Sequence, residues 1–391
     1  MRLFEKIEEY YIHRCLELAR LGMHSASPNP MVGAIVLDAK GKKVGEGYHV
    51  RSGGPHAEIM ALEQAGEDAQ GGTLYVNLEP CSHTGKTPPC TDAIVKAGIE
   101  RVVCGTLDPN PLVSGSGRDA LQNKRISVRY GFLEQDCLRL NETFFHYIST
   151  KTPYVSLKLG LTMDGKIAAR NGQSQWLTGP LSRQFVHHLR SYHDAILTTA
   201  ETVLVDDPEL TVRELPVIAR QPVRVVLDRQ CRLDPMKHKI FDTSEAQTWV
   251  FTSKIHQDRR YLAQLEDRGI QVFEADDTGT GLNMKEVFDT LGQQSISNVF
   301  VEAGGHLAGH LMNANLIHKL YLFYAPRILP DPMAIGAFSD SVNLKLPDTP
   351  DIEIAQSYRL EKDLVVEAYP KRKPIVISGS GAHARTVLSA V

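Results

Sequence analysis

The residues best suited to chemistry are one histidine and two cysteines in the first quarter of the chain, His56, Cys81 and Cys90. One imidazole and two thiolates can hold a zinc ion and leave its fourth position for water, which is typical of catalytic rather than structural zinc sites. Glu58 stands two residues after the histidine, where a carboxylate can move protons. This pattern predicts a hydrolytic zinc site with Glu58 as its catalytic acid and base.

The elements expected around these residues place them at the ends of a strand and of two helices. His56 begins a helix, and the strand 73–78 ends just before Cys81. The helix expected over residues 91–97 has Cys90 at its N-terminus, where the backbone dipoles favour a thiolate. Strands and helices alternate through the first part of the chain, which predicts an α/β domain with helices packed on a sheet.

The segment His56-Ala57-Glu58, together with Pro80-Cys81 and Cys90, resembles the zinc motif of the cytidine-deaminase superfamily. That motif usually has two residues between its cysteines, whereas eight separate Cys81 from Cys90. The wider loop resembles the insertion in the pyrimidine deaminases of riboflavin biosynthesis. The resemblance implies that zinc acidifies its water, and that Glu58 passes the proton to a ring nitrogen and to the departing ammonia.

The same resemblance assigns the substrate of this first site. It implies that Asn29 hydrogen-bonds the pyrimidine, and that His83 and Lys86 in the wide loop bind the ribose phosphate. From the residues alone, Asn29 is more often a turn cap between two prolines, and Lys86 is equally a solvated loop charge.

A second α/β domain is expected after the linker segment 149–153. Apolar strands resume at residue 154, and the segment 302–309 is a glycine-rich turn that follows an apolar strand and opens a helix. Bare amides at such a turn can hold a phosphate, although a simple tight turn is the alternative. The predicted domains are residues 1–149 and 150–370, followed by a C-terminal tail, 371–391.

Five segments of the second half resemble, in the same order, the reductase domain of the bifunctional riboflavin-biosynthesis enzymes, a relative of dihydrofolate reductase. They are residues 161–167, 174–178, 202–213, 222–228 and 301–305. The resemblance implies an α/β fold with a cytidine-deaminase-like three-layer domain and a dihydrofolate-reductase-like domain. It also implies that the second domain binds NADPH and delivers hydride to the ribose carbon of the deaminated product, which opens the sugar to a ribityl chain.

Motif positions in this resemblance give the residues expected around the cofactor and the substrate. The cofactor would contact Gly160, Trp176, Thr202, Asp206, Gly304, Gly305, His306, Leu307, Ala308, Gly309 and His310. The substrate would contact Ser174, Arg190, Leu210, Arg213 and Glu302, with Lys158 polarising the reacting sugar. The two arginines suit a phosphate because a guanidinium matches its oxygens, whereas each arginine taken alone is more often a surface charge.

One position departs from the family pattern. After Leu227-Asp228 the family usually has a small hydroxyl residue, but this chain has Arg229, with Arg232 close by. We hypothesise that one of these arginines pairs with the 2′-phosphate that distinguishes NADPH from NADH.

Composition restricts the classes of protein to which the chain can belong. A length of 391 residues predicts two or three domains, of which we adopt two, and 42% hydrophobic with 23% charged residues is typical of globular proteins. The net charge of -3 gives no overall basic footprint for nucleic acid. The sequence has neither a secretion signal at its N-terminus nor an apolar run of about 18 residues that would span a membrane. Six cysteines are few for this length and fit a reducing compartment, so we expect a cytoplasmic protein.

Two other classes of function remain open from the sequence. One is a nucleic-acid or free-base deaminase with an appended nucleotide-binding module, although a basic face with interleaved aromatic residues is missing. The other is a non-catalytic protein stabilised by zinc, in which Glu58 would have no purpose. The favoured interpretation is a bifunctional enzyme that binds zinc, NADPH and a pyrimidine ribotide, with no nucleic-acid or membrane partner. The family suggests a homo-oligomer, either a dimer or a tetramer.

Overall fold

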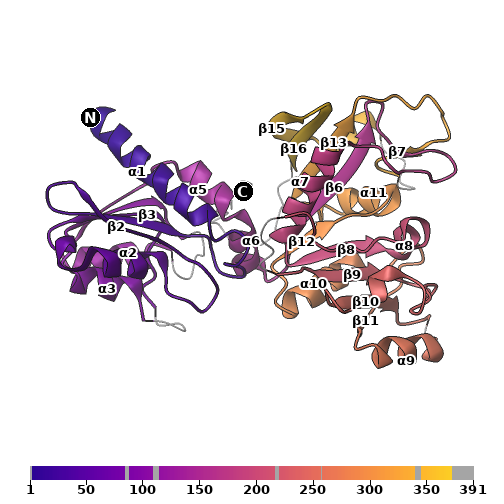
Figure 1. Cartoon of the computed structure of the whole chain (residues 1–391), viewed down its shortest axis with the longest axis horizontal. Helices are drawn as coiled ribbons and strands as arrows, with labels where there is room; N and C mark the ends of the chain where they lie inside the picture. Colours follow the sequence, from indigo (N-terminus) through magenta and orange to yellow (C-terminus); the bar gives the residue numbers. More distant parts are fainter. Residues whose placement is uncertain are drawn as a thin grey trace, which may run out of the picture. The chain divides into compact units, whose positions relative to one another are not determined.

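The computed structural model describes residues 2–83, 88–108, 114–215, 220–256, 258–339 and 345–371. The chain divides into two compact units, the first ending at Lys151 and the second beginning at Thr152 (Figure 1). The boundary predicted between residues 149 and 150 lies two residues before this division. Apart from residue 371, the predicted tail lies outside the described residues.

The first unit is built on a five-stranded sheet in the order β2-β1-β3-β4-β5. Its strands are β1 (Gly33–Leu37), β2 (Lys43–Tyr48), β3 (Thr73–Leu78), β4 (Arg101–Thr106) and β5 (Ser127–Tyr130). Strand β1 is antiparallel to β2 and β3, whereas β3, β4 and β5 run parallel. Strands β1, β3 and β4 are almost completely buried, as expected for strands that are covered on both faces.

Helices cover both faces of this sheet and make it the middle of three layers (Figure 1). They are α1 (Arg2–Arg20), α2 (Ala57–Ala65), the short 3₁₀ helix η1 (Gly66–Ala69), α3 (Cys90–Lys96), α4 (Ser116–Asn123), α5 (Glu134–Leu140) and α6 (Glu142–Thr150). Helices α1 and α5 pack on one face of the sheet, and α2, α3 and α4 pack on the other. The predicted packing of helices on a sheet is confirmed for this unit.

One helix of the first unit differs from the sequence prediction. The pattern predicts a single closing helix over residues 134–148, but the structure has α5 and α6 with Asn141 between them. Asn141 has φ -111° and ψ 19°, outside the helical region, and its side chain bonds the backbone of Met31. The helix is interrupted because Asn141 makes this long-range contact, which a periodicity of apolar residues does not reveal.

The second unit contains a nine-stranded sheet in the order β11-β10-β9-β8-β12-β6-β13-β16-β15. Its strands are β6 (Tyr154–Thr162), β8 (Ala195–Thr199), β9 (Val223–Leu227), β10 (Thr248–Ser253), β11 (Gln271–Ala275), β12 (Asn298–Val301), β13 (Lys319–Ala325), β15 (Ile352–Leu360) and β16 (Asp363–Pro370). All neighbours from β11 to β13 are parallel, and β16 and β15 complete the sheet as an antiparallel hairpin. A separate two-stranded sheet pairs β7 (Lys166–Ala168) with β14 (Ile335–Gly336).

Helices also cover both faces of the large sheet. They are α7 (Pro180–Ser191), α8 (Ala200–Asp206), α9 (Arg259–Asp267), α10 (Met284–Gln293) and α11 (Gly305–Asn313), with short 3₁₀ helices η2 (Lys239–Phe241) and η3 (Leu346–Asp348). Val299 and Val301 of β12 face α10 and α11, whereas Phe300 faces the cluster of α7, α8 and α9. The alternation along β12 therefore divides the core into two layers, as in other doubly wound α/β folds.

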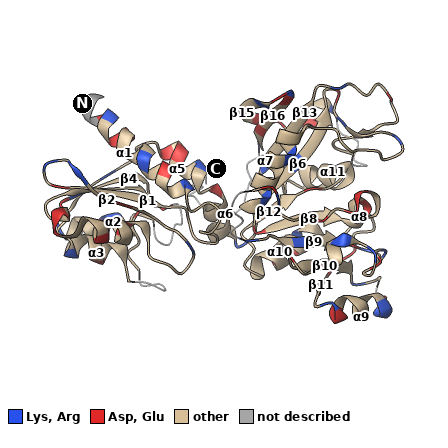
Figure 2. Ribbon diagram, viewed as in Figure 1, with Lys and Arg blue, Asp and Glu red and all other residues tan. Residues whose placement is uncertain are grey.

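Charged residues are distributed over both units. Figure 2 shows basic and acidic residues interspersed along the elements of each unit, in agreement with the small net charge. Within the part of the chain that the structure describes, every helix is too short or too polar to cross a membrane.

Candidate active sites

The three predicted zinc ligands converge in the first unit although they come from separate elements. His56 is the N-cap residue of α2, Cys81 follows β3, and Cys90 is the first residue of α3. His56 Nδ1 lies 3.1 Å from Cys90 Sγ and 3.6 Å from Cys81 Sγ, and all three ligand atoms lie within 4.8 Å of one another. Two ligands of a tetrahedral zinc ion lie about 3.6 Å apart when one is nitrogen and the other sulfur. The residues therefore fit zinc.

The electrostatics of the two cysteines also suit a cation. Hydrogen bonds from the Cys90 thiol, from His56 and from the Cys90 backbone N–H lower the pKa of Cys81 to about 4. The hydrogen bond to Cys81 and burial raise the pKa of Cys90. A bound cation would allow both cysteines to be thiolates at once, since a coordinating thiol is deprotonated.

Glu58 lies in the first turn of α2, directly beside this ligand set. Its side chain is buried, and its carboxyl group interacts with the Cys90 thiol. Burial raises the pKa of Glu58 above its ordinary value, so the group holds a proton more readily than an exposed glutamate. A carboxyl group of raised pKa beside a metal site is suited to both accept and donate a proton.

Asn29 reaches the same region through a histidine that the sequence analysis missed. Asn29 Nδ2 donates to His49 Nε2 at 3.1 Å, and His49 Nδ1 donates to the carbonyl of Pro55 at 2.9 Å. The His49 ring meets the His56 ring edge-on at 5.6 Å. Burial lowers the pKa of His49, which keeps the ring neutral and able to accept from Asn29. The one signal in the sequence is its position just after β2, seven residues before His56.

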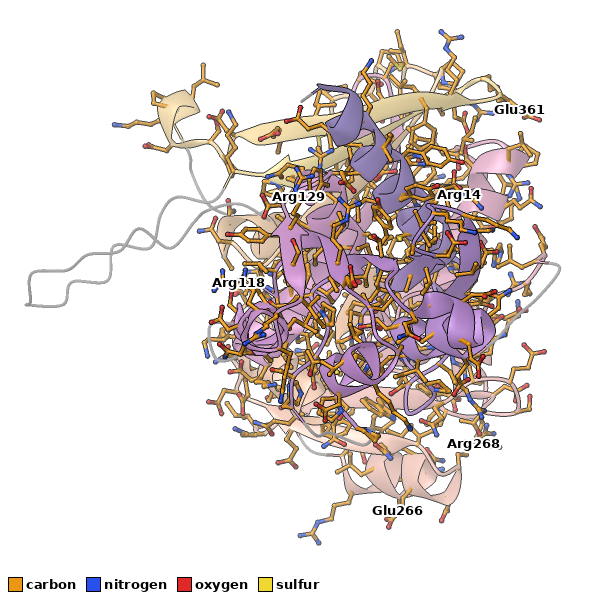
Figure 3. The ribbon with its side chains drawn as sticks, turned by 90° about the vertical axis from the view of Figure 1, so that its left-hand side faces the viewer. Arg14, Arg118, Arg129, Glu266, Arg268 and Glu361 are labelled. Carbon is orange, nitrogen blue, oxygen red and sulfur yellow. The ribbon has the colours of Figure 1, made fainter. Side chains whose placement is uncertain are left out.

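Glu79 is a second residue whose contacts the sequence did not reveal. Its carboxylate accepts backbone N–H groups from Asp108 at 2.9 Å, Gly115 at 3.0 Å and Arg118 at 2.9 Å. Glu79 thus ties the strand that ends before Cys81 to the first turn of α4. Arg118 itself lies at the edge of the first unit, with its guanidinium 5.9 Å from the ring of Tyr130 (Figure 3).

Among the described residues, the structure assigns no contact of the first site to the two predicted phosphate ligands. His83 is exposed at the start of the wide loop. Lys86 lies outside the described residues. Their roles stay predictions.

The second unit has a topological switch point between β8 and β12, which are neighbours in the sheet. The chain leaves β8 through α8 towards β9 on one side, and it leaves β12 through α11 towards β13 on the other side. Ligands of open α/β sheets bind beyond the carboxyl ends of strands at such a point. Thr199 and Gly304, the N-cap residues of α8 and α11, therefore flank the expected ligand site.

The predicted cofactor residues gather around this switch point. Gly304 has no Cβ, and an added Cβ would meet nothing within 4 Å, so open space adjoins the first amides of α11. Thr202 bonds Thr199 at the start of α8. At the other end of α8, Asp206 accepts from Ser174 Oγ at 3.2 Å, which brings a predicted cofactor residue and a predicted substrate residue together.

Other predicted cofactor residues divide by exposure. In the run from Gly304 to His310, Gly305, Ala308 and Gly309 are buried, whereas His306 is exposed and Leu307 and His310 are partly exposed. Trp176 is 63% exposed, and the guanidinium of Arg183 lies 4.6 Å from its ring. Gly160 lies on β6 with Thr178 nearby. Open glycine backbone, first-turn amides and an exposed aromatic ring fit a dinucleotide.

A largely buried group of charges lies at the end of β12. Glu302 accepts hydrogen bonds from Arg190 Nε and Nη2, and Lys158 Nζ lies 3.7 Å from Glu302. Burial lowers the pKa of Lys158, opposed by the charge of Glu302. Burial alone would raise the pKa of Glu302, but the charges of Arg190 and Lys158 lower it below its ordinary value. The structure thus brings three predicted substrate residues into one network.

The remaining predicted substrate residues lie on the segment after α8. Leu210 is only 4% exposed, and its side chain belongs to the core cluster of α7, α8 and α9. Arg213 is exposed and bonds Glu209 and Thr211. Arg190 donates its third hydrogen bond to the carbonyl of Thr211 at 3.1 Å, so the core end of this segment is fixed to the Glu302 network.

The two arginines beyond β9 differ in their partners. Arg229 donates from Nε to Asp277 at 2.7 Å and from Nη2 to the carbonyl of Gly279 at 2.9 Å. Arg232 pairs with Glu201, an exposed residue in the first turn of α8. The hydrogen bond from Arg232 lowers the pKa of Glu201, and the charge of His306 lowers it further. Arg232 is therefore connected to both helices of the switch point.

A cavity of about 570 Å³ lies elsewhere in the second unit, lined by Arg268 and residues of the segment 235–244. It contains none of the predicted site residues, so we assign it no part in either site.

Comparisons with known proteins match both units. The family model described as the cytidine and deoxycytidylate deaminase zinc-binding region matches residues 5–106, and the model of the RibD C-terminal domain matches residues 153–366. The riboflavin biosynthesis protein RibD of Aquifex aeolicus is 42% identical over 85% of this chain and 91% of its own. Its counterpart in Escherichia coli is 42% identical over 82% of this chain and 88% of its own.

Solved structures agree over most of the chain. RibD of Acinetobacter baumannii superposes with a TM-score of 0.83 at 36% identity, covering 94% of this chain and 100% of that one. The diaminohydroxyphosphoribosylaminopyrimidine deaminase/5-amino-6-(5-phosphoribosylamino)uracil reductase of Thermotoga maritima gives a TM-score of 0.81 at 36% identity, covering 94% and 99%. The predicted pairing of a deaminase-like three-layer domain with a dihydrofolate-reductase-like domain is thereby confirmed.

The zinc-binding region, the reductase region and near full-length relatives all point to the same pair of activities. The chain therefore belongs to the RibD family, and it is a bifunctional riboflavin-biosynthesis enzyme with a zinc-dependent deaminase and an NADPH-dependent reductase.

Proposed function

We propose that His56, Cys81 and Cys90 hold the zinc ion of the deaminase and that Glu58 moves its protons. When bound, the ion lowers the pKa of a coordinated water to about 7. With zinc in place, Glu58 would accept one proton from this water and pass it to the ring nitrogen. It would then pass a second proton, from the hydroxyl added to the ring carbon, to the amine, which leaves as ammonia. The observation that carries this assignment is the convergence of the three ligand atoms within 4.8 Å beside a buried carboxyl group.

Asn29 binds the pyrimidine of the diaminopyrimidine ribotide, and His49 orients it. Because the Nε2 atom of neutral His49 accepts from the Asn29 amide NH₂, the side-chain carbonyl of Asn29 is directed by that bond. His83 and Lys86 bind the ribose phosphate, as predicted from the wide loop. An amide held in one orientation can hydrogen-bond only one edge of the ring. It therefore selects the form of the pyrimidine that has not yet been deaminated.

In the reductase, NADPH binds across the switch point between β8 and β12. The first amides of α11 beyond Gly304 hold its pyrophosphate, since helix N-termini favour anions. Thr202 and Asp206 of α8, together with Gly160, Trp176 and the segment from Gly304 to His310, line the remainder of the site. The cofactor supplies hydride to the ribosyl carbon.

The network of Lys158, Arg190 and Glu302 holds the sugar of the deaminated product. Lys158 donates a hydrogen bond to the sugar oxygen, and Glu302 accepts from a sugar hydroxyl. Arg190 acts through Glu302, because its three described hydrogen bonds already go to Glu302 and to the carbonyl of Thr211. Exposed Arg213 binds the substrate phosphate, while Ser174 and Leu210 complete the site.

Of the two arginines beyond β9, Arg232 reads the 2′-phosphate of NADPH. Arg229 is held by Asp277 and by a backbone carbonyl, whereas Arg232 pairs with a glutamate that is itself exposed. A phosphate dianion displaces an exposed carboxylate at little cost, because exposed ion pairs contribute little.

The domain limits of 1–149 and 150–370, a cytoplasmic location and a homo-oligomeric state also belong to this proposal. Each of the six cysteines lies outside any disulfide, which suits a reducing compartment. Strand β15 is an outer strand of the large sheet and exposes Ile354, a feature that a second copy can cover. Light scattering of the purified chain measures whether it is a dimer, a tetramer or a monomer.

One experiment tests the deamination and the reduction together. The wild type and Glu58→Gln are incubated with the diaminopyrimidine ribotide, with and without NADPH, while ammonia and cofactor absorbance are followed. We expect Glu58→Gln to retain zinc, to lose ammonia release and to oxidise NADPH only when the deaminated product is supplied. Ammonia release by Glu58→Gln at the wild-type rate would contradict the role of Glu58.

A further inference from the structure

The backbone of Met31 is held on both sides by a buried asparagine from a distant part of the chain. Asn141 Oδ1 accepts the N–H of Met31 at 2.7 Å, and Asn141 Nδ2 donates to the carbonyl of Met31 at 2.9 Å. The Asn141 side chain is 1% exposed. This pair of bonds fixes the position of one peptide segment much as a neighbouring strand would.

A second asparagine strengthens the same contact. Asn77, which is completely buried in β3, donates to the carbonyl of Met31 at 3.1 Å and accepts the N–H of Gly33 at 2.8 Å. The backbone of Met31 is therefore bonded both to β3, through Asn77, and to the α5–α6 junction, through Asn141, and Gly33 is bonded to Asn77 as well.

The segment that these asparagines hold carries Asn29. Asn29 lies two residues before Met31, and its amide bonds His49. The N–H of His49 in turn donates to the carbonyl of Val32 at 2.9 Å, one residue after Met31. A shift of the Met31 backbone would consequently move both partners of the Asn29–His49 hydrogen bond.

The location of Asn141 indicates that this contact serves more than the packing of a helix. Asn141 interrupts an otherwise continuous helical segment, and its side chain bonds Met31 instead of capping α6. The general deaminase zinc-binding region ends at residue 106, so Asn141 lies 35 residues beyond it.

We propose that Asn141 is a positioning residue of the deaminase, which acts through the backbone of Met31 to place Asn29 against the pyrimidine. This inference rests on the proposed role of Asn29. It makes the α5–α6 junction part of the deaminase site rather than a connection to the second unit.

The test is Asn141→Asp in the full-length, zinc-loaded enzyme. The substitution keeps the size of the side chain and the acceptor for the Met31 N–H. It replaces the donor Nδ2 by an oxygen that repels the Met31 carbonyl. We expect the deaminase KM for the ribotide to rise about tenfold, the usual effect of one lost buried hydrogen bond, with kcat changed less than about twofold. Zinc content and the reductase rate on the deaminated product report whether the variant is folded.

A double-mutant cycle with Asn29→Ala separates positioning from general destabilisation. If Asn141 acts through Asn29, Asn141→Asp raises KM less than about twofold in the Asn29→Ala background. A full tenfold rise in that background, or no rise in the wild-type background, overturns the proposal for Asn141. An unchanged KM in Asn29→Ala alone instead refutes the proposed role of Asn29.

A matched control comes from the second unit. Buried Asn298 makes a similar clamp, accepting the N–H of Asp194 at 2.6 Å and donating to the carbonyl of Tyr192. Asn298→Asp should leave the deaminase KM unchanged, and a rise there would show that this KM responds to any buried charge, against the proposal. Should Asn141→Asp fail to bind zinc, Asn141→Ser, whose shorter side chain removes both bonds without adding a charge, provides the same comparison.

Discussion

Glu302 and Arg190 form a bidentate ion pair inside the second unit. Arg190 Nε lies 2.5 Å from Glu302 Oε1, and Arg190 Nη2 lies 3.1 Å from Glu302 Oε2. Their side chains are 11% and 13% exposed. Because water reaches neither group freely, each charge depends on the other. The pair therefore supports both the fold of this unit and the substrate site proposed around Glu302.

Arg190→Ala should lower the stability of the second unit and abolish most reductase activity. Removing one partner of a buried pair costs about 3–5 kcal/mol of unfolding free energy. Both tryptophans of the chain, Trp176 and Trp249, belong to the second unit, so their fluorescence during urea unfolding measures this unit alone. Ammonia release by the first unit should persist.

The control for this prediction is Arg213→Ala. Arg213 is 44% exposed and pairs with Glu209 at the surface, so its loss should raise the KM for the deaminated product but leave the urea midpoint nearly unchanged. Equal destabilisation by the two substitutions would contradict the distinction between a buried and an exposed arginine.

Removal of zinc should separate the two activities. Dialysis against a chelator is expected to stop ammonia release, because the three ligands then hold no ion to activate water. NADPH oxidation with the deaminated product should continue, and added zinc should restore ammonia release. Deamination by protein shown to be metal-free by elemental analysis would refute the assignment of the ligands.

Arg232→Ala should weaken binding of NADPH without affecting NADH. Loss of one charge-assisted bond to a phosphate corresponds to a rise in the NADPH KM of roughly 10- to 100-fold. Arg229→Ala is the comparison, since Arg229 is already paired with Asp277. A change in NADPH/NADH preference in Arg229→Ala alone would reverse the assignment.

The stability of the second unit should fall as the pH is lowered from about 6.5 to about 4, in part because of His193. Burial lowers the pKa of His193 from 6.5 to about 4. Between these values the unfolded chain binds a proton that the folded chain excludes, so acid favours unfolding. The full shift corresponds to roughly 3 kcal/mol, and above pH 6.5 the effect vanishes.

His193→Asn provides the measurement. An asparagine places its amide near the Nδ1–H that donates to the carbonyl of Leu189 at 2.7 Å, and it does not titrate. Urea midpoints from tryptophan fluorescence should fall less steeply below pH 6.5 in the variant than in the wild type. Parallel curves for the two proteins would exclude His193 as a source of the acid sensitivity.

The zinc site and the order of most elements could be predicted from the sequence because they depend on local patterns. Strand β3 has the predicted limits, 73–78, since it is a short apolar run between turn residues. Cys90 stands at the start of α3, the N-terminal position expected for it.

The contacts that orient the sites could not be predicted, because they join residues far apart in sequence. The bond from Asn141 to Met31 spans 110 residues, and nothing in the surrounding pattern distinguishes Asn141 from an ordinary helix residue. Glu79 and His49 were missed for the same reason. The final hairpin of β15 and β16 was also missed, and β15 is mostly exposed, so it lacks the buried apolar run by which the other strands were found.

The position of β12 in the large sheet has a consequence for synthesis on the ribosome. Strand β6 pairs with β12 and β13, and 135 residues, 163–297, separate β6 from the nearer of these in sequence. At a translation rate of 5–20 residues per second, roughly 7–27 s pass between the synthesis of β6 and that of β12, the first strand with which it pairs. The strands of the first unit are complete by Tyr130, so the deaminase can acquire its metal while the nascent reductase still exposes an unpaired apolar strand to chaperones.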